Sequence, residues 1–490
     1  MVKLITTSVL SHGLPATYSG GKDAFQTRYG FGRAIDGFTY YTLDMPTVIK
    51  PSKDGGFYIG GPYNSIIKYD ANCSIKWAAN SAPTSMYVNG IAEDSKGNVY
   101  CVGSLNYNGL QNDMVIVKYN SVGTQVLRKD LKGAGNDNAH SIAIDSLDNY
   151  YVIGSSNTGA TNVYCVVSKW SNTDVLTWQR KLTANATYGG SVWGYHTSVN
   201  KTFTGNVIIS GIYNLPPAGV QSTIYRHFFA YKTGLLGTNQ IYSKISDTSR
   251  PLIAAAFTDG TSNSYFCYTS NNAGTAGSTP VQSLFVQKDV VDASSDSWNH
   301  LYYSSLTNGS YDLWAYSSNC FDLSNNGTFY AVLHHKNTFA NGRSLNTVLS
   351  INSTGATTTY LGTLRGTNST NLIFTALALD STANNLFLTG YIANSVATTP
   401  ILMKIPTNGT RKGTYKVETA NLGVSYGTYE NELTRNVTPA SGQIFPDTVY
   451  TAATLGNAAG TLTVGGDGSI TSNAFTSSLV TGVASEIKFI

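Results

Sequence analysis

A repeated unit of two strands joined by a tight turn constrains this sequence more than any other feature. The segment Ile91–Gly103 reads IAEDSKGNVYCVG, and the segment Ile142–Gly154 reads IAIDSLDNYYVIG. In both segments an apolar run leads into an Asp-Ser turn that ends on asparagine, and a second apolar run ends on glycine. Two such runs around a turn of this composition predict a β-hairpin. A unit that recurs in this way indicates a repeat architecture.

The residue that ends the second strand of the unit allows the copies to be counted. Seven copies end at positions 61, 103, 154, 211, 268, 333 and 390, so neighbouring copies are 42, 51, 57, 57, 65 and 57 residues apart. This residue is glycine in most copies, but the fifth copy has Tyr268 and the sixth has Leu333. The spacings agree with the roughly 40 to 50 residues of propeller repeats, with loop insertions in the later copies.

Most copies continue into a third strand whose apolar residues lead into a lysine, at Lys68, Lys118, Lys169, Lys232, Lys288 and Lys404. A turn and a fourth strand follow, as in residues 121–128. Four antiparallel strands make one blade of a β-propeller. We therefore predict an all-β fold, a seven-bladed β-propeller of four-stranded antiparallel blades with β-rich extensions at both termini.

The turn of the second copy resembles a known repeat. The matching residues are Asp94, Ser95, Gly97, Asn98, Tyr100 and Gly103. Their order and spacing are similar to the bacterial β-propeller repeat called the SBBP type. The resemblance extends over roughly residues 40–418 and is strongest in the second and third copies. It implies a propeller fold and no particular activity.

The repeat divides the chain into three predicted parts. An N-terminal extension covers residues 1–39, the propeller covers 40–418, and a C-terminal β-rich assembly segment covers 419–490. The last part contains a hairpin pattern at Thr461–Thr471 with glycine-rich turn residues, and Glu486–Ile490 alternates as an edge strand does. We expect both extensions to dock other subunits.

The charge and hydropathy patterns exclude several classes of protein. The chain has 31 Lys and Arg residues against 27 Asp and Glu, and charged residues make up 12% of the sequence, about half the usual quarter. No run of like charges marks a nucleic-acid-binding face. No apolar stretch approaches the roughly 18 residues of a membrane span, and the first residues lack the apolar core of a signal peptide. We expect no nucleic-acid partner, no membrane insertion and no export by the standard route.

Motifs that carry catalysis need fixed spacings, and the sequence shows no nucleophile elbow, HExxH helix, P-loop or EF-hand loop. The five cysteines lie far apart without a CxxC pair, which favours free thiols over a disulfide or zinc site. We interpret Asp94 and Asp145 as turn residues whose carboxylates accept backbone hydrogen bonds. The sequence therefore predicts no enzyme, no catalytic residue, no cofactor and no metal.

Tyrosine-rich segments among Ser, Gly and Asn residues are the main hint of a recognition surface. Tyrosine supplies rigid amphipathic area, and small polar residues supply adaptable hydrogen bonds. The candidates for surface recognition are Tyr63, Tyr107, Trp193, Tyr195 and Trp314. Tyrosine also fills strands well, so most of the 33 tyrosines need no functional explanation. The repeated lysines are open to two interpretations, a ring of charge that binds an anionic polymer or packed side chains whose stems cover neighbours.

The overall composition resembles that of bacteriophage tail and fibre proteins, with low charge, many Gly, Ser, Thr, Asn and Tyr residues, and β-rich extensions around a propeller. This resemblance implies a non-enzymatic virion structural protein, a tail, fibre or adsorption component assembled in the host cytoplasm. Its expected partners are other virion proteins or copies of itself, and a host surface glycan. The alternative is a carbohydrate-binding, lectin-like propeller. A polysaccharide-active enzyme is the third hypothesis.

Overall fold

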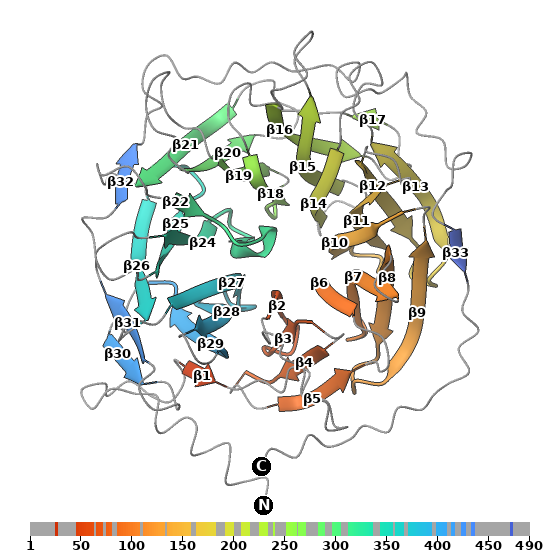
Figure 1. Cartoon of the computed structure of the whole chain (residues 1–490), viewed down its shortest axis with the longest axis horizontal. Coiled ribbons are helices and arrows are strands. Elements are labelled where there is room, and N and C mark those ends of the chain that lie inside the picture. Colours follow the sequence, from red (N-terminus) through yellow and green to blue (C-terminus); the bar gives the residue numbers. More distant parts are fainter. Residues whose placement is uncertain are drawn as a thin grey trace, which may run out of the picture.

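The chain folds into sheets arranged around a common axis (Figure 1). The structure is a computed structural model, and it describes residues 25–27, 46–62, 65–71, 75–80, 86–107, 111–132, 135–157, 163–182, 192–199, 207–215, 225–233, 239–240, 251–261, 263–270, 283–289, 296–304, 312–336, 344–355, 358–366, 371–393, 398–408, 413–416, 423–427, 433–436 and 471–473. Within these residues the strands form seven sheets, one for each copy of the repeat. The predicted all-β propeller fold is confirmed.

The first three blades have four consecutive antiparallel strands each, with the first strand nearest the axis (Figure 1). Blade 1 contains β2 (Val48–Pro51), β3 (Phe57–Gly60), β4 (Ser65–Tyr69) and β5 (Ile75–Asn80). Blade 2 contains β6 (Met86–Glu93), β7 (Val99–Tyr107), β8 (Gln111–Tyr119) and β9 (Gln125–Lys132). Blade 3 contains β10 (Asp137–Ile144), β11 (Tyr150–Asn157), β12 (Val163–Trp170) and β13 (Leu176–Leu182).

The next three blades follow the same order, but blade 6 has a divided inner strand. Blade 4 contains β14 (Val192–Val199), β15 (Val207–Leu215), β16 (Tyr225–Thr233) and β17 (Asn239–Gln240). Blade 5 contains β18 (Pro251–Thr258), β19 (Ser264–Ser270), β20 (Ser283–Asp289) and β21 (Asp296–Ser304). In blade 6, β22 (Asp312–Trp314) and β23 (Phe321–Leu323) both pair with β24 (Phe329–Lys336), and β25 (Ser344–Ile351) and β26 (Thr358–Gly366) complete the sheet. The short 3-10 helix η2 (Ser318–Cys320) lies between β22 and β23.

Blade 7 joins the two ends of the propeller. It contains β27 (Asn371–Leu379), β28 (Asn385–Ala393) and β29 (Thr398–Pro406), and its outermost strand is β1 (Phe25–Thr27) from the N-terminal part of the chain. Phe25 lies opposite Met403 in this antiparallel pair. Strand pairing between distant segments closes the ring with backbone hydrogen bonds.

Four short strands from the C-terminal part extend the outer edges of three blades (Figure 1). They are β31 (Gly423–Gly427) on β26 with β30 (Gly413–Lys416) outside it, β32 (Leu433–Asn436) on β21, and β33 (Thr471–Asn473) on β9. An exposed edge strand invites unwanted pairing, so these additions protect the propeller. The predicted domain bounds 1–39, 40–418 and 419–490 remain predictions, and the strand patterns at Thr461–Thr471 and Glu486–Ile490 fall outside the described residues except for Thr471.

The hydrophobic core consists of clusters between neighbouring blades. Tyr100 of blade 2, for example, packs near Tyr150 and Trp170 of blade 3. Tyr58, Tyr69, Tyr119, Tyr151 and Tyr265 are also almost completely buried. This burial agrees with the prediction that many tyrosines fill strands, because a buried aromatic side chain removes a large apolar area from water.

The Asp-Ser turns have the predicted local chemistry. The Oδ1 atom of Asp94 accepts hydrogen bonds from the backbone N–H groups of Lys96 at 2.9 Å and Asn98 at 2.8 Å. Gly97 has a φ of 79°, a left-handed conformation that suits glycine, and Asp148 takes the matching place in blade 3 with a φ of 62°. The interpretation of Asp94 as a structural turn residue is confirmed.

The glycine that ends the second strand faces a β-bulge in the first strand. In blade 2, Gly103 lies opposite Val88, and the pairing then skips Asn89 before Gly90. A Cβ atom on Gly103 would lie 1.7 Å from the carbonyl oxygen of Tyr87. Corresponding contacts of 2.1 Å at Gly154 and 2.0 Å at Gly390 show that blades 3 and 7 share this constraint. The repeated glycine is therefore required by the bulge.

The two blades without this glycine depart from the common bulge geometry. In blade 5, which has Tyr268 at this position, the pairing skips Leu252, earlier in the inner strand than in blade 2. In blade 6, which has Leu333, η2 interrupts the inner strand. The loss of glycine in the fifth and sixth copies thus coincides with a changed inner strand.

Candidate functional site

The repeated lysines lie near the end of the propeller that carries the tight turns, opposite an aromatic residue on the neighbouring strand. Lys118 is the cross-strand partner of Tyr100, and its Nζ atom lies 4.7 Å from the centre of the Tyr100 ring. The same pairing recurs at Lys68 with Tyr58, Lys169 with Tyr151, Lys288 with Tyr265 and Lys404 with Phe387. Each is a cation–π contact within one blade.

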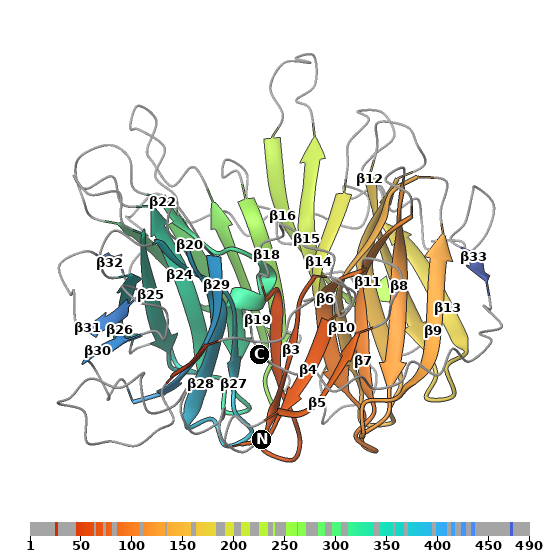
Figure 2. The same ribbon diagram turned by 60° about the horizontal axis from the view of Figure 1, so that its bottom comes forward.

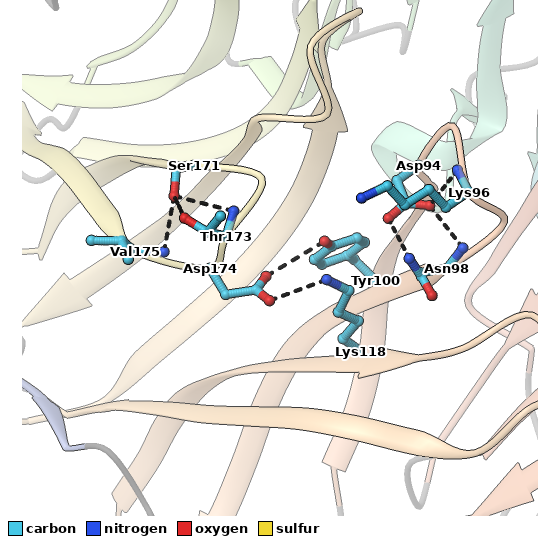
Figure 3. A network of polar contacts seen from close by, with 9 residues as sticks. All are labelled: Asp94, Lys96, Asn98, Tyr100, Lys118, Ser171, Thr173, Asp174 and Val175. Carbon is cyan, nitrogen blue, oxygen red and sulfur yellow. Dashed lines mark hydrogen bonds and ion pairs between the residues drawn. The ribbon is translucent and has the colours of Figure 1, made fainter.

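A carboxylate from the next blade completes the lysine site of blade 2 (Figure 3). The Nζ atom of Lys118 lies 3.1 Å from Oδ2 of Asp174, and the hydroxyl of Tyr100 donates to Oδ1 of Asp174 at 3.5 Å. Burial and the nearby Asp174 carboxylate raise the pKa of Tyr100, so its hydroxyl stays protonated. Asp174 belongs to the turn before β13, so this network joins blades 2 and 3.

Other lysines of the series make comparable contacts. Lys68 pairs with Asp54 at 2.8 Å, and Lys288 donates to the carbonyl oxygen of Ser353 in blade 6 at 2.8 Å. The side chain of Lys68 is only 9% exposed, and that of Lys118 is 12% exposed. This geometry favours the packed interpretation of the lysines over a charged ring that binds an anionic polymer.

One residue of each blade, on the inner strand or directly beside it, takes a corresponding position near the axis. In the six blades whose tight turn the structure describes, this residue stands five positions before the first residue of the turn, and in blade 4 it is Tyr195, which the bulge of β14 leaves unpaired. We call this set the axial ring: Thr47, Asn89, His140, Tyr195, Ala254, Asn319 and Thr375. Asn89, His140, Tyr195 and Thr375 are the residues that the bulges leave unpaired. Bulges redirect side chains and are common near functional sites.

Side chains of the axial ring connect consecutive blades by one recurring hydrogen bond. The amide of Asn89 donates to the carbonyl oxygen of Ala139 at 2.9 Å, directly before His140. The hydroxyls of Thr47 and Thr375 donate to the carbonyl oxygens of Val88 and Pro46. In each pair the acceptor directly precedes the ring residue of the next blade.

The 3-10 helix η2 lies at the centre of the axial ring, as Figure 1 shows. The amide of Asn319 donates to the carbonyl oxygens of Thr47 at 3.2 Å and Asn89 at 3.0 Å. Ser317 donates to the carbonyl oxygen of Thr375 at 2.9 Å, and Ser318 donates to that of Tyr195 at 3.3 Å. The segment around η2 therefore holds the backbones of four other blades.

A second set of residues lies two positions before the axial-ring residue in blades 2, 3, 4, 6 and 7. We call this set, together with Tyr316, the axial face: Tyr87, Asn138, Trp193, Ser317, Ile373 and Tyr316. Tyr87 is 46% exposed and Tyr316 is 38% exposed, while the other four are half-buried. The hydroxyl groups of Tyr316 and Tyr391 form a hydrogen bond. Burial and the neighbouring Tyr316 raise the pKa of Tyr391. Because these residues precede the tight turns by seven or eight positions in their blades, they lie toward the end of the propeller opposite the tight turns. Figure 2 shows the strands of the blades from the side.

A neutral histidine lies in the axial ring beside the axial face. Burial lowers the pKa of His140 to about 4, so the imidazole is uncharged at neutral pH. Its Nε2 atom lies 3.1 Å from the hydroxyl oxygen of Ser155, and its ring centre lies 5.5 Å from that of Tyr195. The axial face thus combines aromatic rings, hydroxyls and the amide of Asn138, with no charged side chain among its six named residues, and the neutral imidazole of His140 lies in the neighbouring axial ring.

The structure places the predicted recognition residues at different sites. Trp193 and Tyr195 lie on β14, in the axial face and the axial ring. Trp314 is the last residue of β22, directly before the segment that leads into η2, and Tyr107 is the last residue of β7. The structure does not describe the side chains of Trp314 and Tyr107, and Tyr63 lies outside the described residues.

Tyr87, Asn138, Tyr316 and Asn319 were not among the candidates predicted from the sequence. A positional signal exists for three of them. Counting five residues back from the Asp or Ser that begins a described tight turn finds Asn319 and the other residues of the axial ring except Tyr195, and counting seven finds Tyr87 and Asn138. That signal has no meaning until the bulges are known to direct these positions toward the axis.

The part of the chain that the structure describes contains no group of three or more His, Cys, Asp or Glu residues arranged to hold a metal ion. It also contains no helix long and apolar enough to cross a membrane. Cys101, Cys165, Cys267 and Cys320 are buried free thiols, as expected for four of the five cysteines.

Comparisons with known proteins identify no family for this chain, and the solved structures that they find have low similarity to it. No protein-family model matches the chain, and no curated protein sequence matches it. The resemblance to SBBP repeats therefore rests on the quoted turn residues alone. Among solved structures, the Dos1 propeller is 12% identical with a TM-score of 0.41, and the alignment covers 74% of this chain and 78% of that one. The Swd1 propeller domain of Myceliophteria thermophila is 7% identical with a TM-score of 0.42, covering 75% and 98%.

Two enzyme types appear among the similar structures. An ulvan lyase of polysaccharide lyase family PL25, bound to a glucuronate–sulfated rhamnose unit, is 10% identical with a TM-score of 0.47, covering 74% of this chain and 94% of that one. An α-L-arabinofuranosidase from Fusarium graminearum is 10% identical with a TM-score of 0.38, covering 75% and 99%. The expectation that this chain is not an enzyme was wrong. Propellers similar to it include enzymes. The lack of a known catalytic motif does not rule out activity on this fold.

Proposed function

We propose that this chain is a recognition protein that binds a neutral glycan at its axial face. The observation that carries the proposal is the position of Tyr87 and Tyr316, because they are the two exposed aromatic residues among the side chains that the structure describes, and both belong to this face. Half-buried Trp193 lies at the same level of the inner strands. Sugar rings present apolar C–H faces that stack on aromatic side chains, and their hydroxyls need hydrogen-bond partners.

The polar groups of the axial face suit a sugar better than an anion or a flat apolar partner. The side chain of Asn138 is half-buried, and amides both donate and accept hydrogen bonds. Lysine and arginine are absent from the six named residues, so nothing in this set would neutralise a phosphate or sulfate. The bonds of η2 to four other blades hold the face in one geometry, which lowers the entropic cost of binding.

Loss of an aromatic ring from the axial face should weaken glycan binding by at least about tenfold, because an aromatic contact contributes roughly 1 kcal/mol or more beyond buried area. The first measurement is a glycan array with the whole chain, followed by calorimetry of the best ligand with Tyr87→Ala and Trp193→Ala. Leu147→Ala is the matched control, since Leu147 is 55% exposed in the tight turn at the other end of the inner strand β10. Absence of saturable binding on the array, or equal affinity for all variants, would refute the proposal.

We also propose, from the composition of the chain, that this recognition takes place on a virus particle. Low charge and abundant Gly, Ser, Thr, Asn and Tyr favour a tail, fibre or adsorption component of a bacteriophage, with a host surface glycan as ligand. Other virion proteins or further copies of the chain would then be its partners. Mass spectrometry of purified virus particles should detect the chain in stoichiometric amounts. Its absence from the particles would exclude a virion location while leaving the glycan site testable.

A polysaccharide-active enzyme is the second candidate, and His140 is the observation that favours it. The imidazole is neutral and half-buried in the axial ring, where a ring nitrogen can hydrogen-bond a bound hydroxyl. Product analysis after incubation with the glycan found on the array distinguishes binding from cleavage. An unchanged chain length of the glycan would remove the enzymatic candidate.

A further inference from the structure

Three consecutive blades place residues of the axial face at equivalent positions on their inner strands. Tyr87 on β6, Asn138 on β10 and Trp193 on β14 each stand two positions before the residue that the bulge of their strand leaves unpaired. The strand β10 packs against β6 on one side and against β14 on the other. Asn138 therefore lies between the two aromatic residues in the ring of inner strands.

The segment around η2 holds β6 and β14 at a fixed spacing. The hydroxyl of Ser318 donates to the carbonyl oxygen of Tyr195 on β14 at 3.3 Å. The amide of the next residue, Asn319, donates to the carbonyl oxygen of Asn89 on β6 at 3.0 Å. Each acceptor stands two positions after the aromatic residue of its strand. Because two consecutive residues make these bonds, the two aromatic residues have a defined separation before any ligand binds, which lowers the entropic cost of a ligand that contacts both.

The side chain of Asn138 offers hydrogen bonds between the two aromatic residues. It is half-buried, and it makes no hydrogen bond with another described residue. Its oxygen accepts and its NH₂ group donates, so it can bond two hydroxyl groups at once. Sugar rings carry hydroxyl groups on neighbouring carbon atoms. A glycan that extends from Tyr87 to Trp193 would meet this amide on its path.

We propose that the axial face binds its glycan as a segment of at least two sugar rings that crosses the inner strands of blades 2, 3 and 4. One ring stacks on Tyr87 and another on Trp193, and hydroxyl groups between these contacts bond the amide of Asn138. A single sugar ring is about as large as one aromatic ring, so it cannot cover two aromatic residues that β10 separates. This inference rests on the proposed function, and it adds the length of the ligand and the direction in which the ligand lies.

Calorimetry with glycan fragments of different lengths tests the size of the ligand. The probes are the neutral glycan with the highest affinity on the array and its fragments of one to four sugar rings, prepared by partial acid hydrolysis. The single ring should bind the whole chain about tenfold more weakly than the longest fragment, because it gains only one stacking contact. A single ring that binds as tightly as the longest fragment would overturn the inference and leave the proposed function standing. Absence of binding by every probe would overturn both.

Substitutions test whether one ligand makes all three contacts. With the longest fragment, Tyr87→Ala and Trp193→Ala should each lower the affinity about tenfold, and Asn138→Ala should lower it about fivefold. With the single ring, only one of the two aromatic substitutions should lower the affinity. Tyr87→Phe keeps the stacking surface and should bind the longest fragment within about twofold of the unchanged chain. Asn172→Ala is the control for Asn138→Ala, since it removes an exposed amide from a turn of the same blade. Full affinity of Tyr87→Ala or Trp193→Ala for the longest fragment, or equal effects of Asn138→Ala and Asn172→Ala, would contradict the inference.

Discussion

Replacing Gly103 by alanine is expected to lower the free energy of unfolding by about 3 kcal/mol, the upper part of the range for overpacked sites. The new Cβ atom would lie 1.7 Å from the carbonyl oxygen of Tyr87. Because that oxygen belongs to the backbone beside the bulge, the inner strand must move, and the bond from Asn89 to Ala139 in the next blade is disturbed. Urea denaturation followed by intrinsic fluorescence measures the loss.

The neighbouring substitution Ser104→Ala is the matched control for Gly103→Ala. Serine already has a Cβ atom, so this substitution leaves an alanine on the same strand without placing a new atom against the backbone. Its effect on the free energy of unfolding should therefore stay within about 1 kcal/mol. Gly154→Ala and Gly390→Ala should resemble Gly103→Ala, since their contacts are of the same kind. If Gly103→Ala unfolds at the same urea concentration as Ser104→Ala, the bulge does not require the glycine.

Replacing Asn319 by alanine is expected to lower the free energy of unfolding by about 2–4 kcal/mol. Each buried carbonyl group left without a donor destabilises the folded state by roughly 1–3 kcal/mol. The Asn319 amide serves the carbonyls of Thr47 and Asn89 and is only 7% exposed. The substitution should also weaken glycan binding, since Ser317 and Tyr316 of the axial face belong to the segment that Asn319 anchors. Denaturation and calorimetry on the same preparation give both quantities.

Two further variants test whether the stability depends on the amide of Asn319 in particular or on the loss of any amide side chain. Asn319→Asp keeps the size but directs a carboxylate at the two carbonyls, so it should destabilise the chain at least as much as alanine. Asn172→Ala removes an exposed amide that donates to the carbonyl oxygen of Leu147 at 3.1 Å, and it should change stability by less than about 0.5 kcal/mol. Equal stability of Asn319→Ala and Asn172→Ala would show that η2 does not hold the inner strands together.

Much of the propeller could be predicted because its signals are local. The Asp94 turn depends on hydrogen bonds to residues two and four positions away, so five consecutive residues contain the whole structure. The strands around it follow from the alternation and length of apolar runs. The lysine that ends the third strand was recognised as a repeat, but its stacking on Tyr100 depends on the pairing of β7 with β8.

The candidate site could be predicted only in part. Trp193 and Tyr195 were selected for their residue type, and the structure places both near the axis on β14. Tyr87 was not selected, since nothing in its neighbourhood distinguishes it from the buried tyrosines of other strands. Its exposure depends on its distance from the axis and on the direction of the bulge, and both result from the closed ring.

The sequence by itself determined the repeat, its seven copies, the turns and the positions of the strands, because each of these depends on backbone geometry within a few consecutive residues. It also marked the fifth and sixth copies as different through Tyr268 and Leu333. Only the tertiary structure decided what these differences produce. Asn319 meets Thr47 and Asn89 across 272 and 230 residues of sequence, so its partners exist only when the ring is closed. The axial face and the contacts of η2 within the axial ring are consequences of that closure.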